Sequence, residues 1–177
     1  MIIPGFIIAW LTFPGVIVHE AGHFLLCRWR GVAVLDACFF RFGNPAGYVV
    51  HEETERFADS FFIGMGPFFV NTALCLLFCL PAFIPVWELE TGDPLSYGFY
   101  WLGISIGMHA FPSTHDLSNI WRLARPAMRA GNLFAILSFP LVAVLYAANF
   151  LRFFWIDLLY GIGVGVGIPL TVFRALA

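Results

Sequence analysis

The residues best suited to chemistry in this chain are two histidines and a glutamate in the run His19-Glu20-Ala21-Gly22-His23. An α-helix turns once every 3.6 residues, so His19 and His23 lie one above the other and can place imidazole nitrogens on one metal ion. Glu20 lies on the adjacent part of that face, where its carboxylate can take a proton from a water molecule on the metal. The spacing therefore predicts one zinc ion held by both imidazoles, with Glu20 as the general base.

The surroundings of this motif strengthen the prediction. The residues on either side are mostly apolar, and a charged side chain inside a membrane-spanning helix costs about 2.5–3.5 kcal/mol on insertion scales. Three ionisable groups in such a run are therefore expected to have a function. The alternative is that two hydrogen-bonded histidines and a glutamate merely face the interior of a helix bundle.

A third ligand is expected elsewhere in the chain, because catalytic zinc usually takes three protein ligands and one water. Cys27 is excluded by distance, since it lies about 12 Å from His19 along the same helix. The glutamates of residues 52–55 lie in a loop with nothing to hold them at helix depth. Asp116 directly follows an apolar segment that runs in the same direction as the first. It is the predicted third ligand, and His115 is the alternative.

The composition assigns these residues to a membrane protein. Of 177 residues, 60% are hydrophobic and only 11% are charged, which excludes an ordinary soluble protein. The net charge of −2 provides too little positive charge for a nucleic-acid-binding protein. The four cysteines lie mostly in apolar runs and are interpreted as buried thiols. We expect one membrane domain over 1–177, with no removed signal peptide, because no positive charge precedes the first apolar segment.

Apolar segments long enough for a bilayer core of about 30 Å predict an all-α polytopic membrane protein with about five transmembrane helices. The segments cover residues 2–27, 57–84, 97–112, 133–151 and 153–173. The third is short and is expected to end or unwind before it crosses completely. Glycines in the last segment predict close packing against another helix.

Two connecting stretches carry structure of their own. Residues 32–51 are rich in β-branched and aromatic side chains around a turn cluster at 43–47, which predicts a β-hairpin that dips into the membrane against protein. Residues 117–129 place apolar side chains on one helical face and arginines elsewhere. This pattern predicts an amphipathic helix at the cytoplasmic membrane interface, bent or ended by Pro126.

The distribution of arginine predicts the orientation, because the chain contains no lysine. Arginines lie between spans one and two, between three and four, and after span five, whereas the loop between spans two and three holds acidic residues and no basic one. Arg152 is the one exception. Because positively charged loops stay in the cytoplasm, we expect an outside N-terminus and a cytoplasmic C-terminus in the cell membrane. The zinc site would then lie toward the cytoplasmic side.

The order of the motifs resembles the site-2 protease family of intramembrane zinc metalloproteases. The motifs are the apolar His-Glu-x-Gly-His helix, the segment Gly-Asn-Pro-Ala-Gly-Tyr-Val at 43–49, the segment Gly-Pro-Phe-Phe-Val-Asn at 66–71, and a late proline followed by an aspartate. The resemblance covers residues 10–125 approximately. The chain would be a divergent minimal member, without a PDZ or CBS domain.

The resemblance implies a three-helix core with one zinc ion and a membrane-dipping β element that receives substrate. The implied site residues are His19, His23 and Asp116 as ligands and Glu20 as the base. The sequence departs from the family pattern at His115-Asp116-Leu117, where the family has Leu-Asp-Gly, and the asparagine that precedes the family's aspartate is absent. Asn71 or His109 is therefore a candidate to stabilise the transition-state oxyanion. Alternatively, the Asn71 amide binds backbone freed by a proline kink and His109 only packs.

The expected activity is hydrolysis of peptide bonds in the transmembrane segments of protein substrates, within the lipid bilayer. A substrate helix must first unwind, and the edge formed by Gly47, Tyr48, Val49 and Val50 is predicted to bind the extended segment by β-addition, unless the hairpin is only a space-filling lid.

Three other functions compete with this one. A non-catalytic zinc-binding membrane protein could act as a partner-binding or regulatory module of the same fold. A di-iron oxidase needs more clustered histidines or carboxylates than this chain contains. A transporter is supported by no internal repeat.

Overall fold

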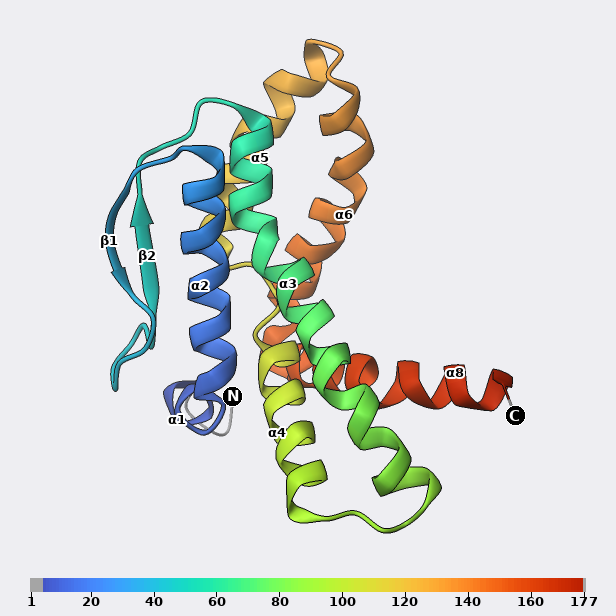
Figure 1. Cartoon of the computed structure of the whole chain (residues 1–177). Helices are drawn as coiled ribbons and strands as arrows, with labels where there is room; N and C mark the ends of the chain where they lie inside the picture. Colours follow the sequence, from blue (N-terminus) through green and yellow to red (C-terminus); the bar gives the residue numbers. More distant parts are fainter. Residues whose placement is uncertain (1–4, 177) are drawn as a thin grey trace.

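The computed structural model describes residues 5–176 and consists of packed helices with a small antiparallel sheet beside them (Figure 1). The mostly α-helical architecture predicted from the sequence is confirmed. The elements, in chain order, are α1 (Gly5–Leu11), α2 (Phe13–Arg30), β1 (Val34–Cys38), β2 (Tyr48–His51), α3 (Phe57–Phe83), the π-helical turn η1 (Ile84–Glu88), α4 (Pro94–Met108), α5 (Thr114–Arg129), α6 (Leu133–Phe150), the 3-10 turn η2 (Leu151–Phe154), α7 (Ile156–Ile162), the π-helical turn η3 (Gly163–Gly167) and α8 (Ile168–Leu176).

Several of these helices are suited to a membrane. By length and composition, three described helical segments can cross a bilayer, namely Phe57–Glu88, Leu133–Phe154 and Ile156–Ala175. The bent pair α1 and α2 would together make a fourth. Helix α4 has 15 residues, fewer than the about 20 that a bilayer core requires, as expected for the short third segment. Five complete spans remain a prediction.

The first apolar segment is not the single helix predicted over 2–27, of which residues 2–4 lie outside the described part of the chain. Helices α1 and α2 meet at Thr12 and are bent by 90°. Pro14 lies in the first turn of α2, where a residue without a backbone N–H is tolerated, so the helix restarts there. The hydroxyl of Thr12 donates a hydrogen bond to the carbonyl of Ile8 at 2.7 Å. Helix α2, which carries His19 and His23, is therefore a separate helix that begins at Phe13.

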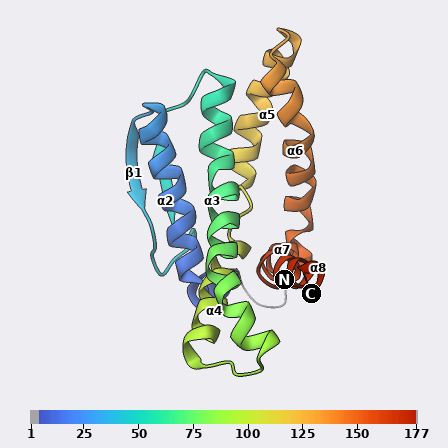
Figure 2. The ribbon, with the colours of Figure 1, turned by 45° about the vertical axis from the view of Figure 1, so that its right-hand side comes forward.

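Helix α3 is the longest element, and two helices pack along it: α4, which holds most of the third predicted span, and α5. Helices α4 and α5 follow one another beside α3 and are separated by an irregular linker at 109–113 (Figure 2). Glycine allows the close approach of α4, because a Cβ on Gly103 would lie 2.4 Å from the sulfur of Cys79 and one on Gly107 would lie 2.7 Å from that of Cys75. The linker is thus held at mid-height of the bundle.

Helix α5 contains the amphipathic helix predicted at 117–129. It begins slightly earlier, and Pro126 lies inside it without ending it. The buried residues of its apolar face are Leu117, Ile120 and Ala124. This face packs in one core with residues of α3 and α6, and the helix runs along them instead of lying across the bundle (Figures 1 and 2). The apolar face is therefore covered by protein, which differs from the predicted position at a lipid interface.

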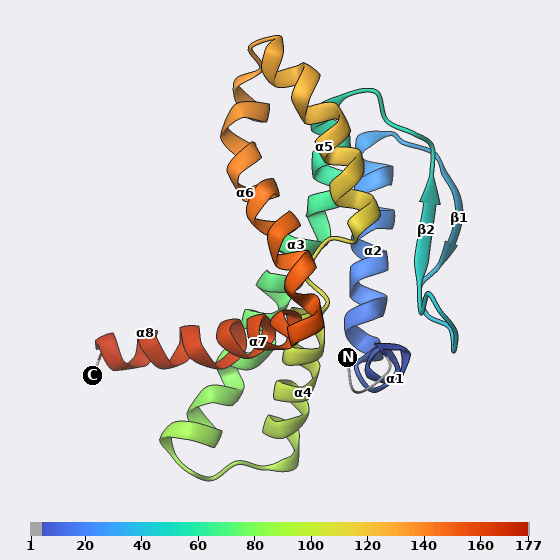
Figure 3. The same ribbon diagram turned by 180° about the vertical axis from the view of Figure 1, so that it is seen from behind.

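The last apolar segment, predicted as one helix over 153–173, is divided. Trp155 has a positive φ of 62° and separates η2 from α7. Helices α7 and α8 then run across the direction of α6 (Figures 1 and 3). The predicted close packing of glycine is found, because a Cβ on Gly161 would lie 3.0 Å from the backbone nitrogen of Met108. Helix α7 therefore packs closely against the C-terminal end of α4.

The hairpin predicted within 32–51 is confirmed as β1 and β2. The strands pair antiparallel, with Ala37 opposite Val49 and Cys38 opposite Tyr48, and the sheet lies beside α2 (Figure 1). The Tyr48 hydroxyl donates to a carboxylate oxygen of Asp36 at 2.9 Å, and this hydrogen bond raises the pKa of Tyr48. This hydrogen bond connects the two strands of the hairpin. The hairpin lies next to α2, the helix that carries the histidines.

Candidate metal centre

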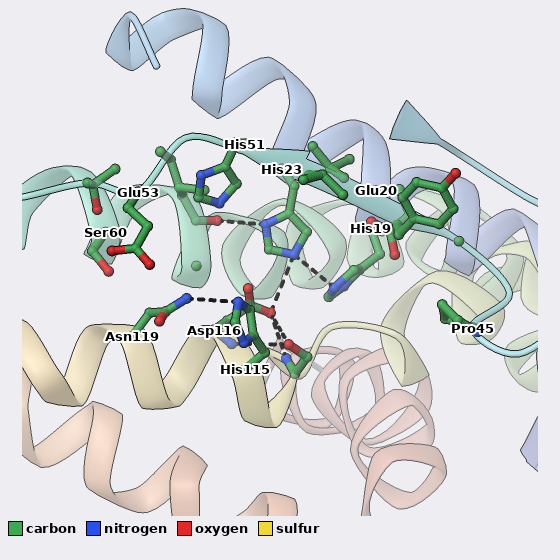
Figure 4. Close-up of a pocket in the computed structure, with 18 of the residues that line it drawn as sticks. His19, Glu20, His23, Pro45, His51, Glu53, Ser60, His115, Asp116 and Asn119 are labelled. Carbon is green, nitrogen blue, oxygen red and sulfur yellow. Dashed lines mark hydrogen bonds and ion pairs between the residues drawn. The ribbon is translucent and has the colours of Figure 1, made fainter. Parts of the chain in front are cut away.

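Two helices bring the three predicted ligands together. His19 and His23 extend from α2, and Asp116 extends from the first turn of α5 (Figure 4). The two Nε2 atoms are 3.1 Å apart, and Nε2 of His23 lies 3.6 Å from Oδ2 of Asp116. Among the described residues, these three form the group of histidine, cysteine and acidic side chains whose ligand atoms could hold a metal ion. The predicted juxtaposition is therefore present.

The hydrogen bonds of the imidazoles determine which nitrogens face the centre. Nδ1 of His19 lies 2.6 Å from the carbonyl oxygen of His109, and Nδ1 of His23 lies 2.9 Å from that of Ile63. A carbonyl oxygen can only accept, so each Nδ1 carries the hydrogen and each neutral ring presents the lone pair of Nε2. Histidine ligands in metal sites commonly have this arrangement, in which the second nitrogen fixes the ring.

Two of the three separations between ligand atoms suit a metal ion such as zinc. Two ligand atoms at about 2.0–2.1 Å from a tetrahedral zinc ion are about 3.3 Å apart, between the two separations observed here. Two lone pairs and a carboxylate oxygen are all acceptors and repel one another unless a positive charge lies among them. The residues present therefore fit a zinc ion with two nitrogen ligands and one oxygen ligand.

The position of Asp116 follows from how α5 begins. Ser113 is the N-cap residue: its hydroxyl accepts from the backbone N–H of Asp116 at 3.1 Å, and its own N–H donates to Oδ2 of Asp116 at 2.9 Å. This reciprocal capping box holds the carboxylate beside the imidazoles. His115, the alternative third ligand, is exposed, and its ring contacts Asn119 instead. Ser113 was not singled out from the sequence, although Ser-x-x-Asp at the start of an amphipathic run signals such a cap.

Glu20 lines the same cleft as the three ligands. It extends from α2 one residue after His19 and lies beneath the hairpin, because a Cβ on Gly47 would come within 2.7 Å of its Cγ. Only glycine fits at position 47 without displacing the Glu20 side chain. The predicted base is thus adjacent to the predicted ligands.

Asn71 lies behind the site, outside the set of residues that line the cleft. It is fully buried, and its amide nitrogen donates to the carbonyls of Ile106 and His109, each at 3.1 Å. The amide therefore supports backbone at the end of α4, and not the backbone freed by a proline kink in its own helix that the sequence offered as the alternative. This position does not favour the predicted role of Asn71 as an oxyanion donor.

His109 likewise turns its side chain away from the ligands. Its Nε2 is 2.8 Å from the hydroxyl of Thr12, and the ring packs against Gly15. Its carbonyl oxygen, in contrast, accepts from both His19 and Asn71. His109 therefore links Thr12, where the first apolar segment bends, to the linker between α4 and α5. Its ring does not line the cleft, which is where an oxyanion would form.

The cleft beside the ligands has a volume of about 470 Å³, and the predicted substrate-binding residues Gly47, Tyr48, Val49 and Val50 all line it. Strand β2 pairs with β1 along one edge, and no described strand pairs with its other edge. The strand crosses the cleft opposite α5, with Pro45 toward one end and Glu53 and Asn119 toward the other (Figure 4). An extended chain could therefore lie between β2 and the three ligands.

Comparison of the chain with protein families, with curated proteins and with solved structures finds no match. The resemblance to the site-2 protease family is therefore carried by the motifs of this sequence alone. A functional proposal must rest on the geometry of the cleft and its residues.

Proposed function

We propose that the chain is an intramembrane zinc metalloprotease that hydrolyses peptide bonds in the transmembrane segments of protein substrates. The observation that carries the proposal is the convergence of three acceptor atoms, from His19, His23 and Asp116, in a cleft bordered by an unpaired strand edge. The first feature suits a metal ion, and the second suits an extended peptide. Glu20, in the same cleft, adds a carboxylate that is not a ligand.

The residues divide the chemistry between them. Zinc held by the two imidazoles and Asp116 would supply a Lewis acid that polarises a peptide carbonyl and promotes loss of a proton from water. The Glu20 carboxylate takes the proton of the attacking water and later gives it to the leaving amine. The carbonyls of His109 and Ile63 keep both rings in the orientation that this requires.

The free edge of β2 is the proposed binding surface for substrate. A transmembrane helix satisfies its own backbone hydrogen bonds, so a segment that unwinds for cleavage needs replacement partners in a medium without water. The backbone of Val49 and its neighbours can supply them by β-addition, without demanding a particular side-chain sequence. The amide of Asn119, a polar donor near Asp116 on the α5 side, is better placed than that of Asn71 to reach a substrate carbonyl.

A second function is a metal-binding membrane protein without turnover, acting as a partner-binding or regulatory module. The observation that favours it is that neither predicted oxyanion donor, Asn71 or His109, lines the cleft. Such a protein would bind zinc as tightly but would leave substrate segments intact.

The experiment that separates the two functions uses purified protein in lipid vesicles, the wild type beside Glu20→Gln, with zinc content and cleavage of a single-span reporter measured on the same samples. We expect equal zinc content and a loss of cleavage of about 10²–10⁴-fold in the variant, the range that general acid–base catalysis contributes. Cleavage at the wild-type rate by Glu20→Gln would contradict the assigned base. Zinc without cleavage in both proteins would favour the second function.

A further inference from the structure

The end of the cleft beyond the ligands is polar, and one charged residue there has no part in the proposed chemistry. Among the described residues that line the cleft, Arg122 is the one arginine. It extends from α5 on the same side as Asp116 and Asn119, because residues three apart along a helix share a face. At the opposite end, near Pro45 and Gly47, the lining includes Glu20 but no arginine, since Arg41, which donates to the Pro45 carbonyl at 3.0 Å, does not line the cleft. The lining of the cleft therefore carries an arginine at one end only.

Arg122 is occupied by a partner from the same chain. Its guanidinium lies 3.6 Å from a carboxylate oxygen of Glu53, in the segment that joins β2 to α3. The two side chains are 54% and 88% exposed, so the pair is weak and a competing carboxylate can replace Glu53. The ion pair connects the β2 side of the cleft with the α5 side at its polar mouth. Glu53 thus occupies the place that an acidic side chain on a bound strand would take.

The spacing places this position on the path of a peptide laid along β2. Arg122 follows Asp116 by six residues, which is about 9 Å along α5. An extended chain covers that distance in about three residues. A side chain about three residues from the bond being cleaved would therefore meet the guanidinium.

Building on the proposed function, we infer that Arg122 determines specificity by selecting substrates with an aspartate or glutamate about three residues from the cleaved bond, at the polar end of the transmembrane segment. A carboxylate there displaces Glu53 and pairs with the guanidinium. A lysine or arginine at the same position is repelled, and these residues are the usual cytoplasmic flank of membrane spans. The cleft would therefore discriminate against most segments that fit β2 through backbone bonds alone.

The test uses synthetic single-span peptides with one leucine- and alanine-rich span in phosphatidylcholine vesicles containing the full chain. Aspartate, asparagine or lysine is placed at each position of one polar flank in turn. We expect one position at which the aspartate peptide is cleaved about fivefold faster than the lysine peptide, in keeping with a partly exposed ion pair. Arg122→Glu should reverse that preference at the same position. The matched control is Arg125→Glu, because Arg125 is exposed on the same helix, lies outside the cleft and should leave the preference unchanged.

A second pair of variants tests the displacement of Glu53. Glu53→Gln removes the internal competitor and should raise the affinity for the aspartate peptide severalfold, whereas Glu55→Gln, on the same loop, should not. Affinity is measured by photocrosslinking to protein that also carries Glu20→Gln, so that binding is read without turnover. An unchanged affinity in Glu53→Gln would contradict the displacement.

These two readouts distinguish failure of the inference from failure of the proposed function. If peptides are cleaved but Arg122→Glu leaves the charge preference unchanged, the specificity role is wrong and the protease assignment stands. If nothing is cleaved but crosslinking favours the aspartate peptide and Arg122→Glu reverses this, the subsite stands and the protease assignment is wrong. If binding shows no charge preference at any position, the inference is overturned.

Discussion

At the residue scale, the carbonyl oxygen of His109 is the atom that supports the proposed metal centre from outside its ligands. It accepts one hydrogen bond from the His19 ring and one from the Asn71 amide. The first bond fixes which nitrogen of His19 faces the ligands, and the second holds the carbonyl itself. Asn71 therefore acts on His19 indirectly, by holding the backbone carbonyl of His109 to which the imidazole donates.

Asn71→Ala should weaken zinc binding by about 10–100-fold, the usual cost of losing a group that orients a ligand. The dissociation constant is measured by competition with a chelator on protein in detergent. Thr72→Ala is the matched control, because the Thr72 hydroxyl contacts Phe68 and Tyr160 and not the site. An affinity equal to that of the wild type in Asn71→Ala would show that the His109 carbonyl does not need its second partner.

The sequence predicts the ligands because helical spacing alone brings His19 and His23 together, and Asp116 is placed by the direction of the spans. It does not predict what fixes the rings. The carbonyl of His109 is a main-chain atom that any residue could carry, and that of Ile63 is free because Pro67, four residues later in α3, has no N–H to bind it. The positions of Asn71 and His109 depend on how α3 and α4 pack, which one sequence does not specify.

At the element scale, the free edge of β2 is the feature that would make the cleft a binding site for a strand. The N–H of Glu52 donates to the carbonyl of Ala33, on the β1 side. Backbone groups alternate in direction along a strand, so the N–H groups of Val50 and Tyr48 also point toward β1 and that of Val49 points to the free edge. Val49 is therefore the residue at which substrate pairing can be removed without unpairing the hairpin.

Val49→Pro should slow cleavage of a single-span reporter by about 2- to 10-fold, the value of one hydrogen bond, while zinc content stays unchanged. Val49→Ala removes side-chain bulk but keeps the N–H, and should cleave nearly as fast as the wild type. Equal rates for Val49→Pro and Val49→Ala would reduce the hairpin to a packing element. Initial rates on the same reporter provide the comparison.

The elements themselves follow from the sequence except at their breaks. The apolar runs predict α3 and α6, and the turn cluster predicts the hairpin. The break at Thr12 is a tertiary effect, stabilised by the contact with His109, and the division of the last segment follows from the positive φ of Trp155. Pro14 is a local signal at the first break, but neither it nor Trp155 is strong enough to override the prediction from a continuous apolar run.

At the scale of the whole molecule, the acidic loop between α3 and α4 is separated from the arginine-bearing helix α5, as the predicted orientation requires. The loop after η1 and the turn after α5 lie at opposite ends of the bundle (Figure 1). The first carries acidic residues, and Asp93 caps α4 there, where the N–H of Ser96 lowers the pKa of Asp93. Arg152, the one exception to the arginine pattern, lies 3.7 Å from Asp157. Its charge is therefore partly neutralised by a partner, which weakens it as an orientation signal.

An epitope tag inserted at residue 131 should be accessible from the cytoplasm, and one inserted at residue 91 should be accessible from outside. The reason is that arginine-rich segments are retained on the cytoplasmic side. Protease protection in sealed vesicles of known orientation measures both positions in separate proteins. Tags protected on the same side would rule out a membrane crossing by α4 and α5, which lie between the two tags, and the reverse assignment would move the cleft to the outer face.

The measurement that tests the metal centre most directly is the zinc content of purified protein together with its X-ray absorption spectrum, for the wild type and Asp116→Ala. The wild type should hold about one zinc ion per chain with nitrogen and oxygen ligands near 2.0–2.1 Å. Asp116→Ala should lose most of the zinc, whereas His115→Ala should retain it, because the His115 side chain is exposed beside Asn119. A wild-type protein that holds no zinc, or an Asp116→Ala protein that holds as much as the wild type, would contradict the account.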